Sequence, residues 1–123
     1  MTCRKAMMLF AAMALAFWNE AVQGVTWVKG GGGSSCETVC SARGGCLEEE
    51  WPMTEEEFTA IAAEAGQTCE TTQHGGAKYD PSTDGRHCGW GGPDEANSEG
   101  GRCVAKGDES TYRFCPCATD KEL

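Results

Sequence analysis

The chain of 123 residues has room for one small domain, and it carries 19 acidic against 10 basic residues, a formal net charge of −9 at pH 7. Such a surface repels the phosphates of nucleic acids and of anionic membranes, which argues against both as partners and against a membrane-active antimicrobial peptide. From residue 25 onward only nine residues are Leu, Ile, Val or Phe. A chain this poor in apolar residues needs covalent support to hold a fold.

Residues 1–24 have the pattern of a secretory signal peptide. A basic pair at residues 4–5 precedes an uncharged apolar run at residues 6–18, and small residues follow as far as Gly24. The run is shorter than the ~20 residues of a membrane-spanning helix, although its last two aromatic residues leave an uncleaved anchor as the alternative. Cleavage is predicted after Gly24, with Ala21 as the second choice. It would leave 8 basic and 18 acidic residues, a net charge of −10.

Eight of the nine cysteines follow the predicted signal peptide, and Cys3 lies within it. An even number of cysteines in a short secreted chain is typical of a disulfide framework, here of four bridges. Eight cysteines can pair in about 105 ways, so the count alone leaves the connectivity open. The eight residues are Cys36, Cys40, Cys46, Cys69, Cys88, Cys103, Cys115 and Cys117.

The predicted organisation is a Gly-rich N-terminal segment at residues 25–35, a cysteine-rich domain at residues 36–117 and a C-terminal tail at residues 118–123. In the first segment, Trp27 and Val28 are expected to pack on the domain or to form an edge strand, and the four glycines that follow form a flexible joint. Ser35 then predicts the N-cap of a short helix that Gly44 or Gly45 ends.

A second short helix or turn is expected at residues 46–53, where Leu47 and Trp51 share a buried side and Pro52 ends the element. The best-specified element is a helix over residues 55–65. Thr54 and Glu57 form a capping box, and the acidic residues 55–57 suit the positive end of the helix dipole. Phe58, Ile61, Ala62 and Ala65 lie on one apolar stripe, and Gly66 is a natural stop.

Beyond Cys69 turn-forming residues dominate and helical periodicity disappears. We expect loops there, with a short hairpin around Cys88 and Cys103. The alternating sequence TYRFC at residues 111–115 predicts a final short strand. The expected fold class is a small disulfide-rich domain of mainly short α-helices and loops with one or two short strands, α+β at most.

The pair Cys115 and Cys117, separated only by Pro116, fits a metal site, a redox dithiol or two separate disulfides. Structural zinc prefers CxxC pairs, and nothing else in the sequence resembles a thioredoxin. Residues two apart on a strand lie about 6.6 Å apart on one side, and residues four apart on a helix are separated by about 6 Å of rise. The C-terminal pair therefore matches Cys36 and Cys40, and two parallel disulfides are expected to staple the first helix to the last strand.

Other candidate chemistries have simpler interpretations. The sequence DPSTDG at residues 80–85 resembles a calcium loop, but Gly91 stands where that loop needs its twelfth-position Glu, so a turn is predicted. His74 and His87 lie in Gly-rich stretches without a catalytic motif around them. The acidic clusters at residues 48–50 and 55–57 are interpreted as helix-end charge and solubility rather than as a cation site. No catalytic residue, metal or cofactor is predicted.

Taken together, the segments SCETVCSARGGCLEEE, TC, YDPSTDGRHCGW, RC and YRFCPC resemble the cysteine-rich C-terminal region of family 18 glycosyltransferases, the α-1,6-mannosylglycoprotein 6-β-N-acetylglucosaminyltransferases (N-acetylglucosaminyltransferase V). The resemblance spans about residues 27–117. It implies the pairs Cys36–Cys115, Cys40–Cys117, Cys46–Cys103 and Cys69–Cys88. The large catalytic domain of those enzymes has no counterpart in the sequence, so the resemblance implies a fold and a preference for glycans without the activity.

The sequence therefore predicts a non-catalytic, secreted binding or interaction module, with a glycan or a glycoprotein as its partner. Two alternatives stay open: an accessory or degenerate glycosyltransferase fragment that needs a partner chain, and a secreted inhibitor or effector. The candidate stacking surfaces are Trp27, Trp51, Tyr79, Trp90 and Tyr112, each of which packing also explains. The final residues DKEL permute the first two letters of an ER-retention signal, so the ER lumen is the alternative location.

Overall fold

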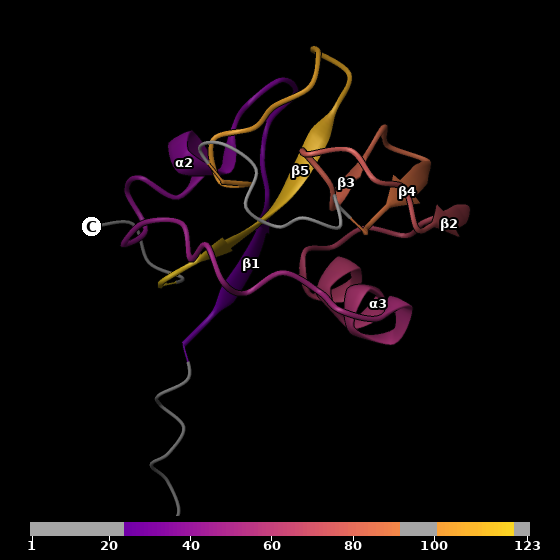
Figure 1. Ribbon diagram of the computed structural model, residues 1–123, viewed down its shortest axis with the longest axis horizontal. Helices are drawn as coiled ribbons and strands as arrows, with labels where there is room; N and C mark the ends of the chain where they lie inside the picture. Colours follow the sequence, from indigo (N-terminus) through magenta and orange to yellow (C-terminus); the bar gives the residue numbers. More distant parts are fainter. Residues whose placement is uncertain (1–23, 92–100, 120–123) are drawn as a thin grey trace, which may run out of the picture.

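Figure 1 shows the computed structural model of the chain, which describes residues 24–91 and 101–119. The predicted signal peptide, apart from Gly24, and the C-terminal DKEL sequence lie outside the described residues. Within the described ranges, no helix has the length and apolar character needed to cross a membrane. The elements in chain order are β1 (Thr26–Lys29), α2 (Cys36–Val39), α3 (Glu55–Glu64), β2 (Thr71–Gln73), β3 (Ser82–Thr83), β4 (His87–Gly89) and β5 (Tyr112–Cys117).

The strands form one sheet with the spatial order β1-β5-β3-β4-β2 (Figure 1). β5 is antiparallel to both of its neighbours, and among these pairings only that of β2 with β4 is parallel. β1 pairs with the C-terminal part of β5, where Thr26 lies opposite Cys117. β3 pairs with the first two residues of β5, where Thr83 lies opposite Tyr112. The last strand of the chain therefore joins the two halves of the sheet.

The predicted small disulfide-rich α+β class is confirmed, and the sheet is larger than the one or two strands expected. The alternation of residues 111–115 corresponds to β5, and Trp27 and Val28 lie on β1. The predicted hairpin exists as β3 and β4, but it does not include Cys103, which lies in a turn. β2 was not predicted, because three residues carry little pattern of their own and pair in parallel with a strand fourteen residues away.

The two helices begin where capping residues predict. The Ser35 side chain accepts a hydrogen bond from the Thr38 amide at 3.1 Å, but α2 ends at Val39, before the glycines expected to stop it. Thr54 caps α3 by accepting from the Glu57 amide at 3.0 Å. The Glu57 carboxylate accepts in return from the amide of Met53, one residue before the cap. This reciprocal arrangement satisfies two amides at the start of α3.

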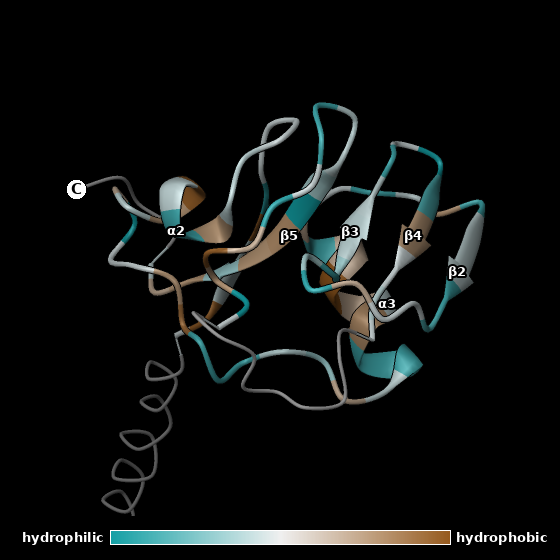
Figure 2. Cartoon of the chain, turned by 45° about the horizontal axis from the view of Figure 1, so that its top comes forward, coloured by the Kyte–Doolittle hydropathy of each residue, from teal (hydrophilic) through white to brown (hydrophobic). Residues whose placement is uncertain are grey.

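β5 is buried on both faces. Because successive side chains of a strand point to opposite sides, Phe114 and Cys115 enter different clusters. Phe114 packs edge to face on Phe58 of α3 with ring centroids 5.4 Å apart, within a cluster that includes Ile61 and Trp90. Cys115 belongs to the cluster of half-cystines that packs α2 on the other side. Figure 2 shows the apolar side of α3 turned toward the sheet and its hydrophilic turn facing away.

Four disulfides join the described residues, in the pairing that the family resemblance implies. Cys36 pairs with Cys115 and Cys40 with Cys117, so α2 is stapled twice to β5. The other two bridges are Cys46–Cys103 and Cys69–Cys88. All four half-cystines of the double staple have no exposed surface. The expected geometry of two parallel bridges between helix and strand is therefore present.

Candidate functional site

The structure does not bring the five predicted stacking residues together. Trp27 and Trp51 pack edge to face on each other with centroids 6.3 Å apart, and Trp90 is buried in the apolar cluster. Tyr112 borders a wide, open hollow of about 510 Å³ formed with residues 108–110. Only Tyr79 lines the pocket that lies over β3 and β4. All three tryptophans thus make packing contacts, and Trp27 and Trp51 also keep part of their surface exposed.

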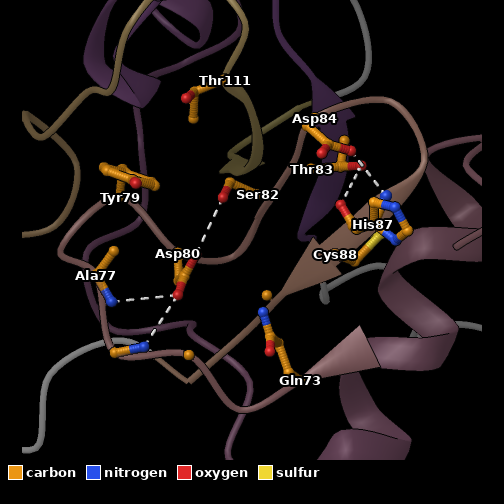
Figure 3. A pocket seen from close by; sticks show the side chains of 13 residues that line it. Gln73, Ala77, Tyr79, Asp80, Ser82, Thr83, Asp84, His87, Cys88 and Thr111 are labelled. Carbon is orange, nitrogen blue, oxygen red and sulfur yellow. Dashed lines mark hydrogen bonds between the residues drawn. The ribbon is translucent and has the colours of Figure 1, made fainter. Parts of the chain in front are cut away.

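The pocket over β3 and β4 has a volume of about 330 Å³ (Figure 3). Tyr79 forms one wall, and the hairpin side chains Thr83, Asp84 and His87 lie together on the opposite side. Ser82 lies between the two walls, and Gln73 of β2 borders the other end of the pocket. Its volume is at the small end of ligand pockets, which span ~300–1,000 Å³.

Asp80 holds the base of the pocket in shape. Its buried carboxylate accepts hydrogen bonds from the amides of Gly76 and Ala77, at 3.1 and 3.2 Å, and from the Ser82 hydroxyl at 2.9 Å. A Cβ at Gly75 would overlap this carboxylate, so the residue must be glycine for the loop to close around it. The peptide bond from Asp80 to the next residue is cis. Asp80 is therefore a structural anchor, with three hydrogen bonds used inside the protein.

Asp84 shapes the β3–β4 turn in a similar way. Its carboxylate accepts from the amides of Arg86 at 2.9 Å and His87 at 2.8 Å. These amide donors, His87 first and then Arg86, lower the pKa of the Asp84 carboxyl. The exposed side chain is therefore ionised at neutral pH and keeps lone pairs for a further donor in the pocket.

Three groups of the pocket can bind a molecule. Among the described residues, no hydrogen bond uses the Tyr79 hydroxyl or the side-chain amide of Gln73. His87 Nδ1 is hydrogen-bonded to the Thr71 hydroxyl at 2.9 Å, which leaves Nε2 of the same ring to bind a ligand. A phenol, an amide and an imidazole provide both donors and acceptors around an aromatic wall. The pocket thus offers stacking and hydrogen bonding, and the ionised Asp84 carboxylate is a further acceptor at its edge.

The other chemistries considered from the sequence have structural outcomes. Cys115 and Cys117 are both in disulfides, so the CxC pair is no free dithiol in this structure. The described part of the chain contains no group of three or more His, Cys, Asp or Glu residues arranged to hold a metal ion. Glu48, from the first acidic cluster, accepts from the amides of Arg102 and Cys103 and from the indole of Trp51. That carboxylate fastens a turn.

Comparisons of the chain with protein-family models, with curated proteins and with solved structures find no match.

Sequence reasoning missed most of the pocket residues. Asp80 and Asp84 belong to a segment predicted to be a turn, and the sequence assigns no role to His87, which lies in a Gly-rich stretch without a catalytic motif. Gln73 lies on the strand that was not predicted. The only local signal was the density of Gly, Ser, Thr and Asp in residues 75–89, which indicates closely packed turns but not a pocket between them.

Proposed function

We propose that the chain is a secreted or lumenal binding module, without catalytic activity of its own, that holds a neutral saccharide of a glycan or glycoprotein in the pocket beside Tyr79. The observation that carries the proposal is the combination of one aromatic wall with unused amide and imidazole groups in a hollow of about 330 Å³. Sugars present apolar C–H faces and rings of hydroxyls, so they are bound by aromatic stacking and by paired donors and acceptors.

Two further points support this assignment. The four disulfides are typical of proteins that fold in an oxidising compartment, where glycans are displayed. The resemblance of residues 27–117 to a region of glycan-modifying enzymes points to the same class of ligand, although that support is analogy at the level of the fold. Asp80 and Asp84 are engaged with amide and hydroxyl donors of their own loops, which suits a rigid binding wall better than proton transfer.

The test is a glycan array probed with the full chain after expression through a secretory pathway, with four bridges confirmed by non-reducing mass spectrometry. Selective binding to one group of neutral glycans that disappears on reduction is the expected result. Tyr79→Ala should weaken it about fivefold, the value of one aromatic contact of about 1 kcal/mol. Tyr112→Ala is the matched control, because Tyr112 lies outside this pocket.

Two results would refute the proposal. The first is an oxidised protein that binds no glycan on the array. The second is a protein that binds equally well with and without the Tyr79 ring, since that would place any binding surface elsewhere.

A further inference from the structure

Two arginines are buried behind the pocket without a carboxylate partner. Arg102 is 5% exposed and Arg113 is fully buried. The ion pair found among the described residues joins Arg86 to Glu70 on the surface, so neither buried guanidinium takes part in one. Both lie against the ring of Trp51, with Cζ 4.7 Å and 5.6 Å from its centroid.

The two guanidinium groups donate to consecutive carbonyls of the pocket wall. Arg113 Nε donates to the Tyr79 carbonyl at 2.7 Å, and Arg102 Nη2 donates to the Asp80 carbonyl at 2.7 Å. Arg113 Nη1 also donates to the carbonyls of Arg102 and Ala105, at 2.6 Å each. The wall segment is therefore connected through charged donors to the turn at residues 102–105 and to β5.

This arrangement is costly for the fold. Burial, and then the neighbouring Arg102, lowers the pKa of Arg113 to about 10. Burial likewise lowers the pKa of Arg102. The nearby carboxylates of Asp80 and Glu48 attract both cations without forming an ion pair, so they offset only part of the desolvation of two adjacent buried charges. What the two arginines supply in return is a fixed position for two carbonyls in a segment outside any helix or strand.

We infer that Arg102 and Arg113 are positioning residues of the saccharide pocket, which hold the main chain of Tyr79 and Asp80 so that the Tyr79 ring forms a fixed wall. The inference rests on the proposed function, since it assigns a role within the same site. Neither arginine lines the pocket, so both act through the wall segment. The stem of each side chain stays packed while its charged end sets the position of the backbone.

The test compares Arg102→Met, Arg102→Lys and Arg86→Met in the full oxidised chain. Met keeps the apolar stem and removes the donors, and Lys restores a charged donor without the planar fork. Arg86→Met is the matched control, because Arg86 forms the exposed ion pair with Glu70. Amide hydrogen exchange is read at Ala77 and Asp80 of the wall segment and, for reference, at Gly30 and Cys40, whose amides bond to Arg113 and Cys36.

In Arg102→Met we expect exchange at Ala77 and Asp80 to accelerate at least about tenfold while Gly30 and Cys40 change less than about twofold. Affinity for mannotriose, cellotriose or chitotriose, whichever the unmodified protein binds, should fall about tenfold, the value of one hydrogen bond from a charged donor. Arg102→Lys should recover most of both effects, and Arg86→Met should show neither.

Unchanged exchange at the wall, or an equal increase at the wall and at the reference amides, would overturn the positioning role. Should Arg102→Met fail to fold, the same comparison is made with Arg102→Gln, which removes the charged donors and keeps a polar end, and an increase in exchange confined to the wall supports the role. A protein that binds none of the three oligosaccharides would count against the proposed function. The exchange measurement would still decide whether the arginines hold the wall.

Discussion

Removing the double staple one bridge at a time tests how the disulfides stabilise this fold. Cys36–Cys115 and Cys40–Cys117 close sequence separations of 79 and 77 residues. Taken singly, loops of that length correspond to ~4–5 kcal/mol each in the loop-entropy account. The two bridges interlace along the chain, however, and Cys46–Cys103 lies inside both. The loop that each bridge closes in the presence of the others is therefore much shorter.

The magnitudes follow from the short rings that the interlaced bridges close together. With Cys36–Cys115 in place, Cys40–Cys117 closes a ring of only about six residues, worth about 2 kcal/mol. With both removed, restoring one bridge closes a ring of about 22 residues through Cys46–Cys103, worth about 3.4 kcal/mol. Each single removal should therefore cost about 2 kcal/mol in loop entropy. The double removal should cost about 1 kcal/mol more than the sum of the two.

The assay is equilibrium unfolding in guanidinium chloride of oxidised variants in which both cysteines of a bridge are replaced by Ala. Lost packing of the buried sulfurs adds to each single value, so the interaction energy of the double-mutant cycle decides the question. A control cycle pairs Cys40–Cys117 with Cys69–Cys88, which shares no short loop with it, and should be additive within about 0.5 kcal/mol. Full additivity in the staple cycle would refute the reasoning from short shared rings. Single losses near 4–5 kcal/mol, with no extra loss in the double variant, would refute it as well.

Three further predictions follow from local contacts. Thr54→Ala should lower the free energy of unfolding by about 1 kcal/mol, measured by chemical denaturation, because α3 loses its N-cap. Thr59→Ala is the control, since Thr59 lies within the same helix and does not cap it. The pKa of Asp84 is lower in the folded state than in the unfolded state, so the ionised carboxylate stabilises the fold at pH values above the unfolded-state pKa, and this stabilisation is lost as pH falls through the folded-state pKa. Asp84→Asn should therefore make the free energy of unfolding fall less steeply at acid pH, and an unchanged slope would contradict this. When the oxidised protein is titrated with a mild thiol reductant, differential alkylation should show that Cys69–Cys88 is reduced before the two bridges of the double staple. The reason is that Cys69 is partly exposed, whereas the four half-cystines of the staple are fully buried. Earlier reduction of the staple would contradict this prediction.

The sequence alone predicted the elements that depend on contacts between residues close together in the chain. Thr54 and Glu57 specify the start of α3 through contacts within one turn, and Phe58 and Ile61 specify its buried face. The CxxxC and CxC spacings predicted the double staple because each pair presents both sulfurs on one side. These features require knowledge of only a few residues at a time.

The pocket depends on contacts that no short segment encodes. β2 has three residues and acquires its place by pairing in parallel with β4. Tyr79 becomes a pocket wall only because the carbonyl it carries is bound by Arg113, 34 residues later in the chain. The burial of a fully charged arginine runs against its usual place on the surface, so composition predicts the opposite. Long-range polar contacts of this kind are visible only in the structure.

The scarcity of apolar side chains explains why this fold positions its pocket with cations. Residues 77–80 and 102–105 lie outside any helix or strand, and the apolar cluster beneath α3 does not extend to them. Their backbone is held instead by polar contacts and, in the second segment, also by the Cys46–Cys103 disulfide and the Glu48 carboxylate. Arg113, the second residue of β5, donates to carbonyls from both segments, and such bonds from a charged donor are strong. These bonds use only the backbone carbonyls of the wall, so the Tyr79 side chain is free to face the pocket. A binding site built on loops needs this kind of support, in which a fixed backbone holds the side chains that contact the ligand.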